Sequence, residues 1–146
     1  MRSNPKIKRL HLDLSEHPAS ALAGVVSPEP DYKISLLINR KLGISLKNTL
    51  PLITGTREDD KSTFSRFSDT SSPHGVVYEL ISNHGGKDYL IRKLRNIDYF
   101  FVIHNSESGT ETERIISLLR KTDSVTAVLI IDAEKLKDKN LKYLIP

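Results

Sequence analysis

Histidines are the residues of this 146-residue sequence best suited to bind a metal ion or to move a proton near neutral pH. The five are His11, His17, His74, His84 and His104. No two of them follow the His-x-His, His-x-x-x-His or His-Glu-x-x-His spacings that direct two imidazoles at one metal ion. The sequence has no cysteine, which excludes thiol nucleophiles, disulfides and iron–sulfur ligation. We predict no metal site, and we expect His74 and His84 to be exposed in turns.

Asp98 and His104 are an acid and a base that lie on the same face of one expected strand. Six residues separate them, and at about 3.3 Å per residue this is roughly 20 Å, far beyond a hydrogen bond. Each side chain needs a partner from another element, so we expect Asp98 to bind the main chain or a nearby Arg or Lys. An enzyme assembled from distant residues stays open. It would require at least two of these residues, or of His11 and Asp13, to converge in a pocket.

Motifs for phosphate binding and acyl transfer are missing from the sequence. The Gly85-Gly86 pair lacks the Gly-x-Gly-x-x-Gly spacing, and there is neither a Gly-Lys-Ser/Thr loop nor a Gly-x-Ser-x-Gly elbow. The acidic run Glu58-Asp59-Asp60 lacks the alternating ligands and the glycine turn of a cation-binding loop, so a solvated loop is expected. We predict no catalytic residue and no cofactor, and we favour a non-catalytic protein.

Basic clusters are the remaining chemical feature. Twenty-two Lys and Arg against 18 Asp and Glu give a formal net charge of +4, which is mild. Two clusters are candidate contacts for RNA or DNA: Lys6, Lys8 and Arg9 in the first, and Lys87, Arg92, Lys93 and Arg95 in the second. Tyr89 lies within the second cluster, as aromatic side chains do in surfaces that bind single strands. The alternative is that both clusters are solvated and bind nothing.

Apolar periodicity predicts the strands that carry these residues. They are 6–14, 22–26, 62–69, 76–82, 97–104 and 125–131. Strand 6–14 alternates cleanly between apolar and polar residues, and we expect it to pair with 22–26 at an edge of the sheet. Strands 97–104 and 125–131 are apolar on both faces, which predicts that both are central and covered on both sides.

Two main helices and one short helix are expected. Helix 31–42 begins at Asp31, whose carboxylate can cap it, and ends at Gly43, a natural left-handed stop. A Thr-x-x-Glu capping box at 110–113 opens the second helix. A short third helix follows the aspartate at 132. The order of strands and helices predicts an α+β fold, with a mostly antiparallel sheet of about six strands and the helices packed on it.

The chain is expected to form one domain spanning 1–146, and its length fits that interpretation. The longest apolar run, 125–131, is far short of the about 20 residues that a membrane-spanning helix needs. The alternation in 6–14 does not match the continuous apolar region of a signal peptide. We therefore expect no membrane association and a cytoplasmic location.

Short motifs extend over much of the chain. Asp31-Tyr32 opens the first helix, Asn39 and Leu42-Gly43 close it, and Ile97-Asp98-Tyr99-Phe100-Phe101 lies in the expected central strand. With these motifs the chain resembles the IPExxxVDY family of small bacterial proteins, known from Bacteroidetes. The resemblance covers nearly the whole length and implies a small cytoplasmic bacterial domain. It implies no established activity, cofactor or partner.

The name-giving motif of that family is only partly kept. Ile91, Asp98 and Tyr99 match it. The departures are Arg92 for proline, Lys93 for glutamate and Ile97 for valine. They weaken any role assigned to the proline–glutamate pair.

Two non-catalytic functions follow from these observations. The first is a cytoplasmic domain that uses a sheet edge such as 6–14, or an apolar groove, to hold a protein partner or a second copy of itself. The alternative is an RNA- or DNA-associated protein that uses the two basic clusters, and its binding would fall steeply with salt. A stable dimer at micromolar concentration would favour the first.

Overall fold

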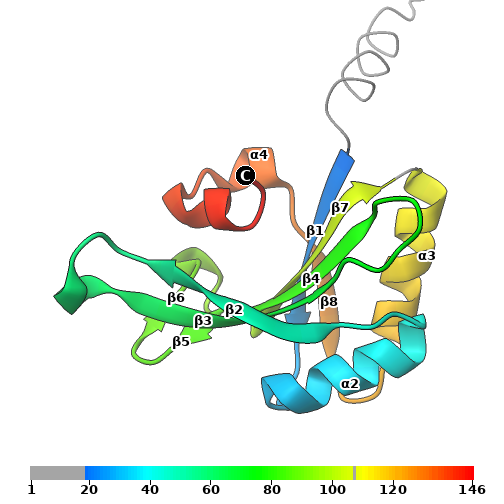
Figure 1. The fold of residues 1–146 in the computed structure, drawn as a ribbon, viewed down its shortest axis with the longest axis horizontal. Helices are drawn as coiled ribbons and strands as arrows, with labels where there is room; N and C mark the ends of the chain where they lie inside the picture. The colour runs from blue at the N-terminus through cyan, green and yellow to red at the C-terminus, as the bar shows by residue number, and fades with distance from the viewer. Residues whose placement is uncertain (1–18, 107) are drawn as a thin grey trace, which may run out of the picture.

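Six antiparallel strands form the central sheet of the computed structural model, which describes residues 19–106 and 108–146 (Figure 1). They are β1 Ala19–Val26, β2 Lys47–Thr54, β3 Ser62–Asp69, β4 Val77–Ser82, β7 Tyr99–Ser106 and β8 Ala127–Ile130. Their order across the sheet is β2-β3-β4-β7-β1-β8. Strands β5 His84–Gly85 and β6 Asp88–Tyr89 form a separate short hairpin. The α+β class expected from the sequence is confirmed.

Three α-helices accompany the sheet in the described residues: α2 Asp31–Leu42, α3 Gly109–Arg120 and α4 Ala133–Leu136. Helix α2 has the predicted bounds and ends at Gly43, whose φ is 70°. Its N-cap is Pro30 rather than Asp31, whose carboxylate instead accepts a hydrogen bond from the N–H of Tyr32 at 2.6 Å. Asp132 caps α4 as predicted. None of these helices combines the length and the apolarity that crossing a bilayer requires.

The start of α3 corrects the predicted capping box. Ser108, not Thr110, is the N-cap, and its hydroxyl accepts a hydrogen bond from the N–H of Glu111 at 3.1 Å. Ser108-x-x-Glu111 is a second Ser/Thr-x-x-Glu pattern that lies two residues before the predicted one. Both patterns follow the end of β7 at Ser106, and α3 begins at the earlier one.

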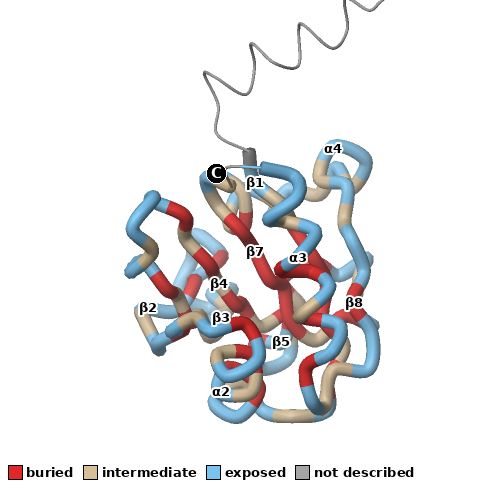
Figure 2. Tube along the Cα trace, turned by 90° about the vertical axis from the view of Figure 1, so that its right-hand side faces the viewer, coloured by how far each residue is buried: buried red, intermediate tan, exposed pale blue. Residues whose placement is uncertain are grey.

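Apolar side chains pack on both faces of the sheet. Helices α2 and α3 cover one face, where Ile38 and Phe101 belong to one buried cluster. Segment 90–97 and the C-terminal region cover the other face, where Phe100 packs in a cluster with Leu144. Strand β7 lies between these layers and is buried along most of its length (Figure 2). The prediction that this strand is central and covered on both sides is confirmed.

Strand β8 is an edge strand, so the predicted central position of 125–131 is wrong. Only Val128 is buried, whereas Leu129 and Ile130 are 45% and 63% exposed. Consecutive residues of 125–131 are apolar, and this pattern predicts that other parts of the protein cover both faces of the strand. Periodicity reports apolar character, however, and not whether another strand lies beyond. The conclusion that the sheet has two covered middle strands therefore holds for β7 alone.

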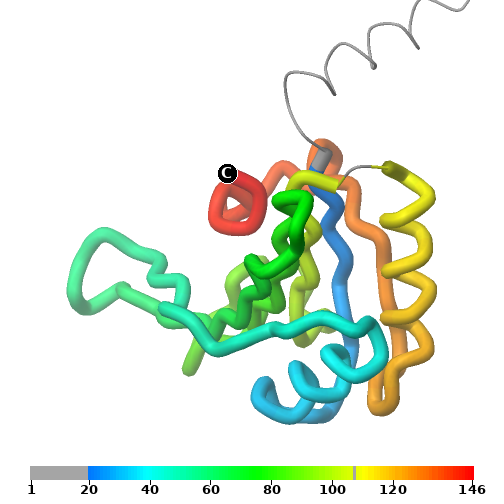
Figure 3. The backbone as a smooth tube through the Cα atoms, turned by 45° about the vertical axis from the view of Figure 1, so that its right-hand side comes forward, coloured from blue at the N-terminus to red at the C-terminus, as the bar shows by residue number. Residues whose placement is uncertain are grey.

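Strand β2 forms the other edge and is missing from the sequence-based prediction. Pro51 argues against a strand, but an edge tolerates proline because its N–H is not needed for pairing. The β2–β3 hairpin extends well beyond the helical layer (Figure 3). The predicted strand 6–14 lies outside the described residues. Its predicted pairing with β1 does not fit, because β7 and β8 already flank β1 on both sides.

Candidate functional site

The outer side of β8 is an open sheet edge in the part of the chain that the structure describes. The N–H of Ile131 donates to the carbonyl of Leu22 at 2.9 Å. Because successive residues of a strand direct their main-chain groups to opposite sides, Val128 and Ile130 direct theirs away from β1. Leu129 and Ile130 add exposed apolar side chains. This edge offers hydrogen-bonding groups and apolar surface together.

The opposite edge, β2, is protected against further pairing. Pro51 lacks an N–H, and the register shifts between Thr49 and Leu52. The side chain of Arg66 donates to the carbonyl of Leu50 at 2.9 Å, so this acceptor is already used. Proline, bulges and charged side chains are the usual protection of natural edges. Strand β8, with the sequence Ala-Val-Leu-Ile, has no proline and no charge.

Asp98 binds the main chain and a histidine. Its Oδ2 accepts the N–H of Ser27 at 2.9 Å, and its Oδ1 lies 3.1 Å from Nε2 of His84. The predicted main-chain partner is therefore confirmed, whereas the expected Arg or Lys partner is replaced by His84. The His84 ring also packs against Tyr89, with ring centroids 5.0 Å apart. His84 is 45% exposed, as predicted, but it lies in strand β5 and not in a turn, and it has fixed partners.

His104 has its carboxylate partner on the neighbouring strand. Its Nε2 lies 2.8 Å from Oε1 of Glu79, whose Oε2 accepts the hydroxyl of Ser68 at 3.0 Å. Asp98 and His104 thus have separate partners and do not converge, while His11 and Asp13 lie outside the described residues. Across residues 19–106 and 108–146, no group of three or more His, Asp or Glu side chains is placed to hold a metal ion. These groups provide no support for an enzyme.

The Glu79–His104 pair makes stability depend on pH. Burial alone would raise the pKa of Glu79, but hydrogen bonds from His104 and Ser68 hold it below its ordinary value. A carboxyl with a lowered folded-state pKa stabilises the fold above its unfolded pKa, and this contribution is lost as pH falls through the folded value. We expect Glu79→Gln to lower the free energy of unfolding by about 1–2 kcal/mol at neutral pH. The difference should shrink below about pH 4.3, the ordinary range of a glutamate.

Urea unfolding at neutral pH and at about pH 3 measures this difference. Glu113→Gln is the matched control, because Glu113 is exposed on α3 and its replacement should change stability by less than about 0.5 kcal/mol. An equal loss at both pH values in Glu79→Gln would show that the carboxylate charge is not the cause.

A hollow of about 510 Å³ brings cations of two distant segments together. Arg92 and Lys93 of the predicted basic cluster line it with Lys137 and Lys139 of the C-terminal region. The Lys93 ammonium donates to the carbonyl of Leu136 at 3.2 Å, which joins the two segments. Lysines alternate along the sequence at 135, 137 and 139. This spacing is the feature of the sequence that could have indicated the C-terminal part of the hollow.

The other predicted basic contacts lie elsewhere. Lys87 and Arg95 are exposed but do not line the hollow. Lys6, Lys8 and Arg9 lie outside the described residues. Acidic side chains also line the hollow, and Asp88 binds Arg92 at 2.9 Å. That hydrogen bond raises the pKa of Arg92 and lowers that of Asp88. Of the predicted contacts, only Arg92 and Lys93 therefore belong to this surface, which four cations and three aspartates line together.

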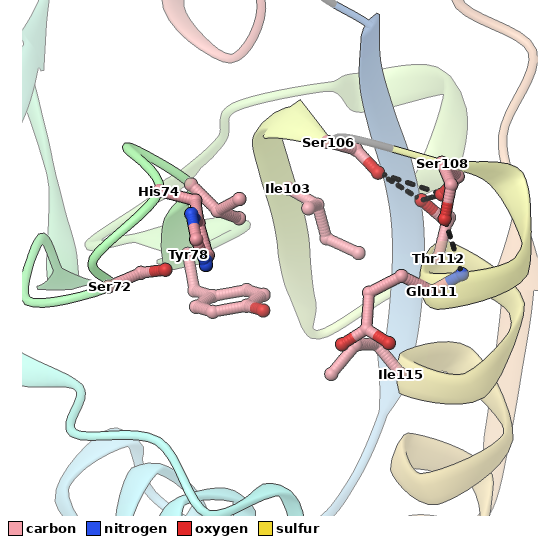
Figure 4. A pocket seen from close by; sticks show the side chains of 10 residues that line it. Ser72, His74, Tyr78, Ile103, Ser106, Ser108, Glu111, Thr112 and Ile115 are labelled. Atoms are coloured by element: carbon pink, nitrogen blue, oxygen red, sulfur yellow. Dashed lines mark hydrogen bonds between the residues drawn. The ribbon is translucent and has the colours of Figure 1, made fainter.

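A smaller cavity of about 350 Å³ lies between β4, β7 and the first turn of α3 (Figure 4). Tyr78 and His74 lie on one side of it, and Ser106, Thr112 and Glu111 lie on the other. Its apolar lining comes from Val76, Ile103 and Ile115. Sequence reasoning missed this cavity, because its residues come from three separate segments and no local spacing connects them.

The motif residues that support the family resemblance have structural roles here. Ile91 is fully buried, and its N–H donates to Oδ1 of Asn83 at 2.8 Å. The Tyr99 hydroxyl donates to the carbonyl of Glu29 at 2.6 Å. Burial, reinforced by nearby carboxylates, raises the pKa of Tyr99 to about 12. Asp98 and Tyr99 tie the start of β7 to residues 27–29 that follow β1, and Ile91 ties segment 90–97 to Asn83 after β4.

Residues 19–106 and 108–146 thus form an α+β fold whose sheet has one protected edge and one open edge. Neither a scan against models of protein families nor a comparison with curated proteins finds a match for this chain. The geometry of its own residues therefore carries the functional argument.

Proposed function

We propose that this chain is a non-catalytic protein-binding domain that associates with a second copy of itself through β8. The observation that carries the proposal is the unprotected edge, where apolar side chains 45% and 63% exposed lie beside main-chain groups that no described strand pairs. Native sheets cover or charge such edges, because an open edge is a template for another strand. The open edge of β8 therefore supports pairing of this strand with a strand of another chain.

A second copy fits this edge by symmetry. Most soluble homo-oligomers are two-fold dimers, in which the same patch lies on both subunits. With the two-fold axis at Leu129, Val128 of each chain lies opposite Ile130 of the other. These are the two residues that direct N–H and C=O groups outward, so each opposed pair can exchange both hydrogen bonds. The pairing would join two six-stranded sheets into one.

Size-exclusion chromatography with light scattering on the full chain tests this proposal. We expect a dimer at micromolar concentration for the wild type and a monomer for Ile130→Lys, because lysine on an edge opposes further pairing. Ile53→Lys is the matched control: Ile53 is 55% exposed on the protected β2 edge, so this variant should stay dimeric.

A monomeric wild-type chain would overturn the proposal, whether β8 is then covered by the predicted strand 6–14 or by nothing. A dimer that survives in Ile130→Lys as it does in Ile53→Lys would also overturn it. In both variants the far-ultraviolet circular dichroism should match the wild type, because the replaced side chains are largely exposed.

We also propose membership of the IPExxxVDY family and action in the bacterial cytoplasm. The support is the set of motif residues named above, which together hold β7 against its neighbours. Because that resemblance implies no activity, the proposal of self-association rests on the β8 edge alone.

RNA or DNA binding is the second candidate function, favoured by the hollow in which Arg92 and Lys93 meet Lys137 and Lys139. A polyanion would contact this surface through its phosphates, so binding would fall steeply with salt. We expect wild-type protein to be retained on heparin and the double variant Lys137→Glu/Lys139→Glu to elute at lower salt.

The control for this prediction carries the same charge change elsewhere. Lys41→Glu/Lys47→Glu replaces two exposed lysines at the end of α2 and the start of β2. If both double variants elute at the same salt concentration, retention reports net charge and not the hollow, and the second candidate is removed.

A further inference from the structure

The hydroxyl of Tyr78 is the starting point. Tyr78 is only 8% exposed, and its ring stacks on Phe101 with centroids 6.0 Å apart. Figure 4 shows its hydroxyl directed toward the Glu111 side of the 350 Å³ cavity. No described residue provides it with a hydrogen-bond partner, although buried polar groups are almost always paired. The hydroxyl of Tyr99, in contrast, is bound to the Glu29 carbonyl.

Unused hydrogen-bond acceptors face Tyr78 across the cavity. Oγ of Ser106 lies 2.6 Å from Oγ1 of Thr112, and each also lies within 3.2 Å of the carbonyl oxygen of Ser108. A hydroxyl has one hydrogen and two lone pairs. The two hydroxyl hydrogens are used within this group, so lone pairs remain on both side chains. The cavity thus has a donor on one wall and acceptors on the other.

The charges around the cavity largely cancel. The Glu111 carboxylate receives two hydrogen bonds from Arg114, at 2.7 and 2.9 Å. It also lies in the first turn of α3, where the helix dipole favours negative charge. A cationic ligand would meet that positive helix end, and an anionic ligand would meet Glu111. Both of these interactions are repulsive, and a neutral ligand avoids them.

We propose that this cavity binds a small, neutral, polyhydroxylated molecule of monosaccharide size. Its hydroxyl groups would accept from Tyr78 and donate to Ser106, Thr112 and Glu111. Its C–H groups would lie on the apolar lining formed by Val76, Ile103 and Ile115. A volume of about 350 Å³ is within the usual size of small-molecule pockets, which combine an apolar lining with a few placed polar groups. The site does not depend on β8 or on self-association.

Two-dimensional ¹H–¹⁵N spectra of the full chain test the proposal, with D-glucose, D-galactose and N-acetyl-D-glucosamine as neutral probes. Acetate and ethylammonium are charged probes of smaller size. We expect at least one sugar to give saturable shifts at the amides of Ser106, Glu111 and Thr112. Neither charged probe should do so.

Tyr78→Phe removes only the unpaired hydroxyl and keeps the ring, so it should weaken sugar binding about tenfold, the equivalent of one lost hydrogen bond. Tyr99→Phe is the matched control, because its hydroxyl lies outside the cavity lining, and it should bind the sugar as the wild type does. Absence of saturable shifts with every sugar would overturn the proposal. So would tighter binding of a charged probe, or unchanged binding in Tyr78→Phe.

Discussion

Replacing Phe101 with alanine is expected to lower the free energy of unfolding by about 3–5 kcal/mol, as for other buried aromatic side chains. Phe101 has no exposed surface, and its ring stacks on Tyr78 at an interplanar angle of 26°. Strand β7 is hydrogen-bonded to β4 on one side and to β1 on the other. The backbone around the missing ring therefore cannot collapse into the space, and a cavity remains.

Equilibrium unfolding in urea measures this loss as a lower transition midpoint. Leu36→Ala is the control, since Leu36 is 54% exposed on α2, and its replacement should cost less than about 0.5 kcal/mol. A loss below about 1 kcal/mol in Phe101→Ala would contradict the central position of β7, because a fully buried phenylalanine carries several times that contribution.

The central strand and the helices were predictable because their signals are local. In 97–104 apolar residues occur at both odd-numbered and even-numbered positions. In the structure, packed side chains cover both faces of β7. In α2, the apolar spacing predicts the buried side of the helix, and Gly43 predicts its C-terminal end. Each signal depends on residues a few positions apart, and each element buries the side that its pattern predicts.

The sheet edges could not be predicted, because an edge is defined by what lies beside a strand. The apolar run around Leu129 and Ile130 looks like that of β7, yet β8 has one neighbour in the described sheet. Pro51 hides β2 for the same reason, since it excludes a central strand but not an edge. Strand β8 was predicted at the wrong position in the sheet, and β2 was not predicted at all.

The partners of the polar side chains also could not be predicted from short spacings in the sequence. The 20 Å argument correctly predicts that Asp98 and His104 do not meet each other. Their true partners, His84 of β5 and Glu79 of β4, come from other segments of the chain, and the tertiary fold brings them within 3.1 and 2.8 Å. The cavity beside Tyr78 arises in the same way, from segments that no short spacing connects.

Asn83 directly precedes His84, for which the sequence predicts an exposed turn. Asn83 itself is fully buried. Its Nδ2 donates to the carbonyls of Leu94 and Ile97 at 2.9 and 3.0 Å, and its Oδ1 accepts the N–H of Ile91 at 2.8 Å. The Asn83 side chain thus makes the hydrogen bonds that a neighbouring strand would otherwise make with segment 90–97. This segment covers the second face of the sheet.

Asn83→Ala is expected to cost about 3–4 kcal/mol, because it leaves the N–H of Ile91 and the carbonyl of Ile97 without partners in the interior, each worth about 1–3 kcal/mol before relaxation. The Leu94 carbonyl keeps its hydrogen bond from the N–H of Ile97 at 2.9 Å. The amide of Ile91 should then exchange with solvent much faster than in the wild type. Asn96→Ala tests the same segment at an exposed asparagine and should change stability by less than about 0.5 kcal/mol. Equal effects of the two variants would mean that apolar burial alone, through Ile91 and Ile97, holds this segment on the sheet.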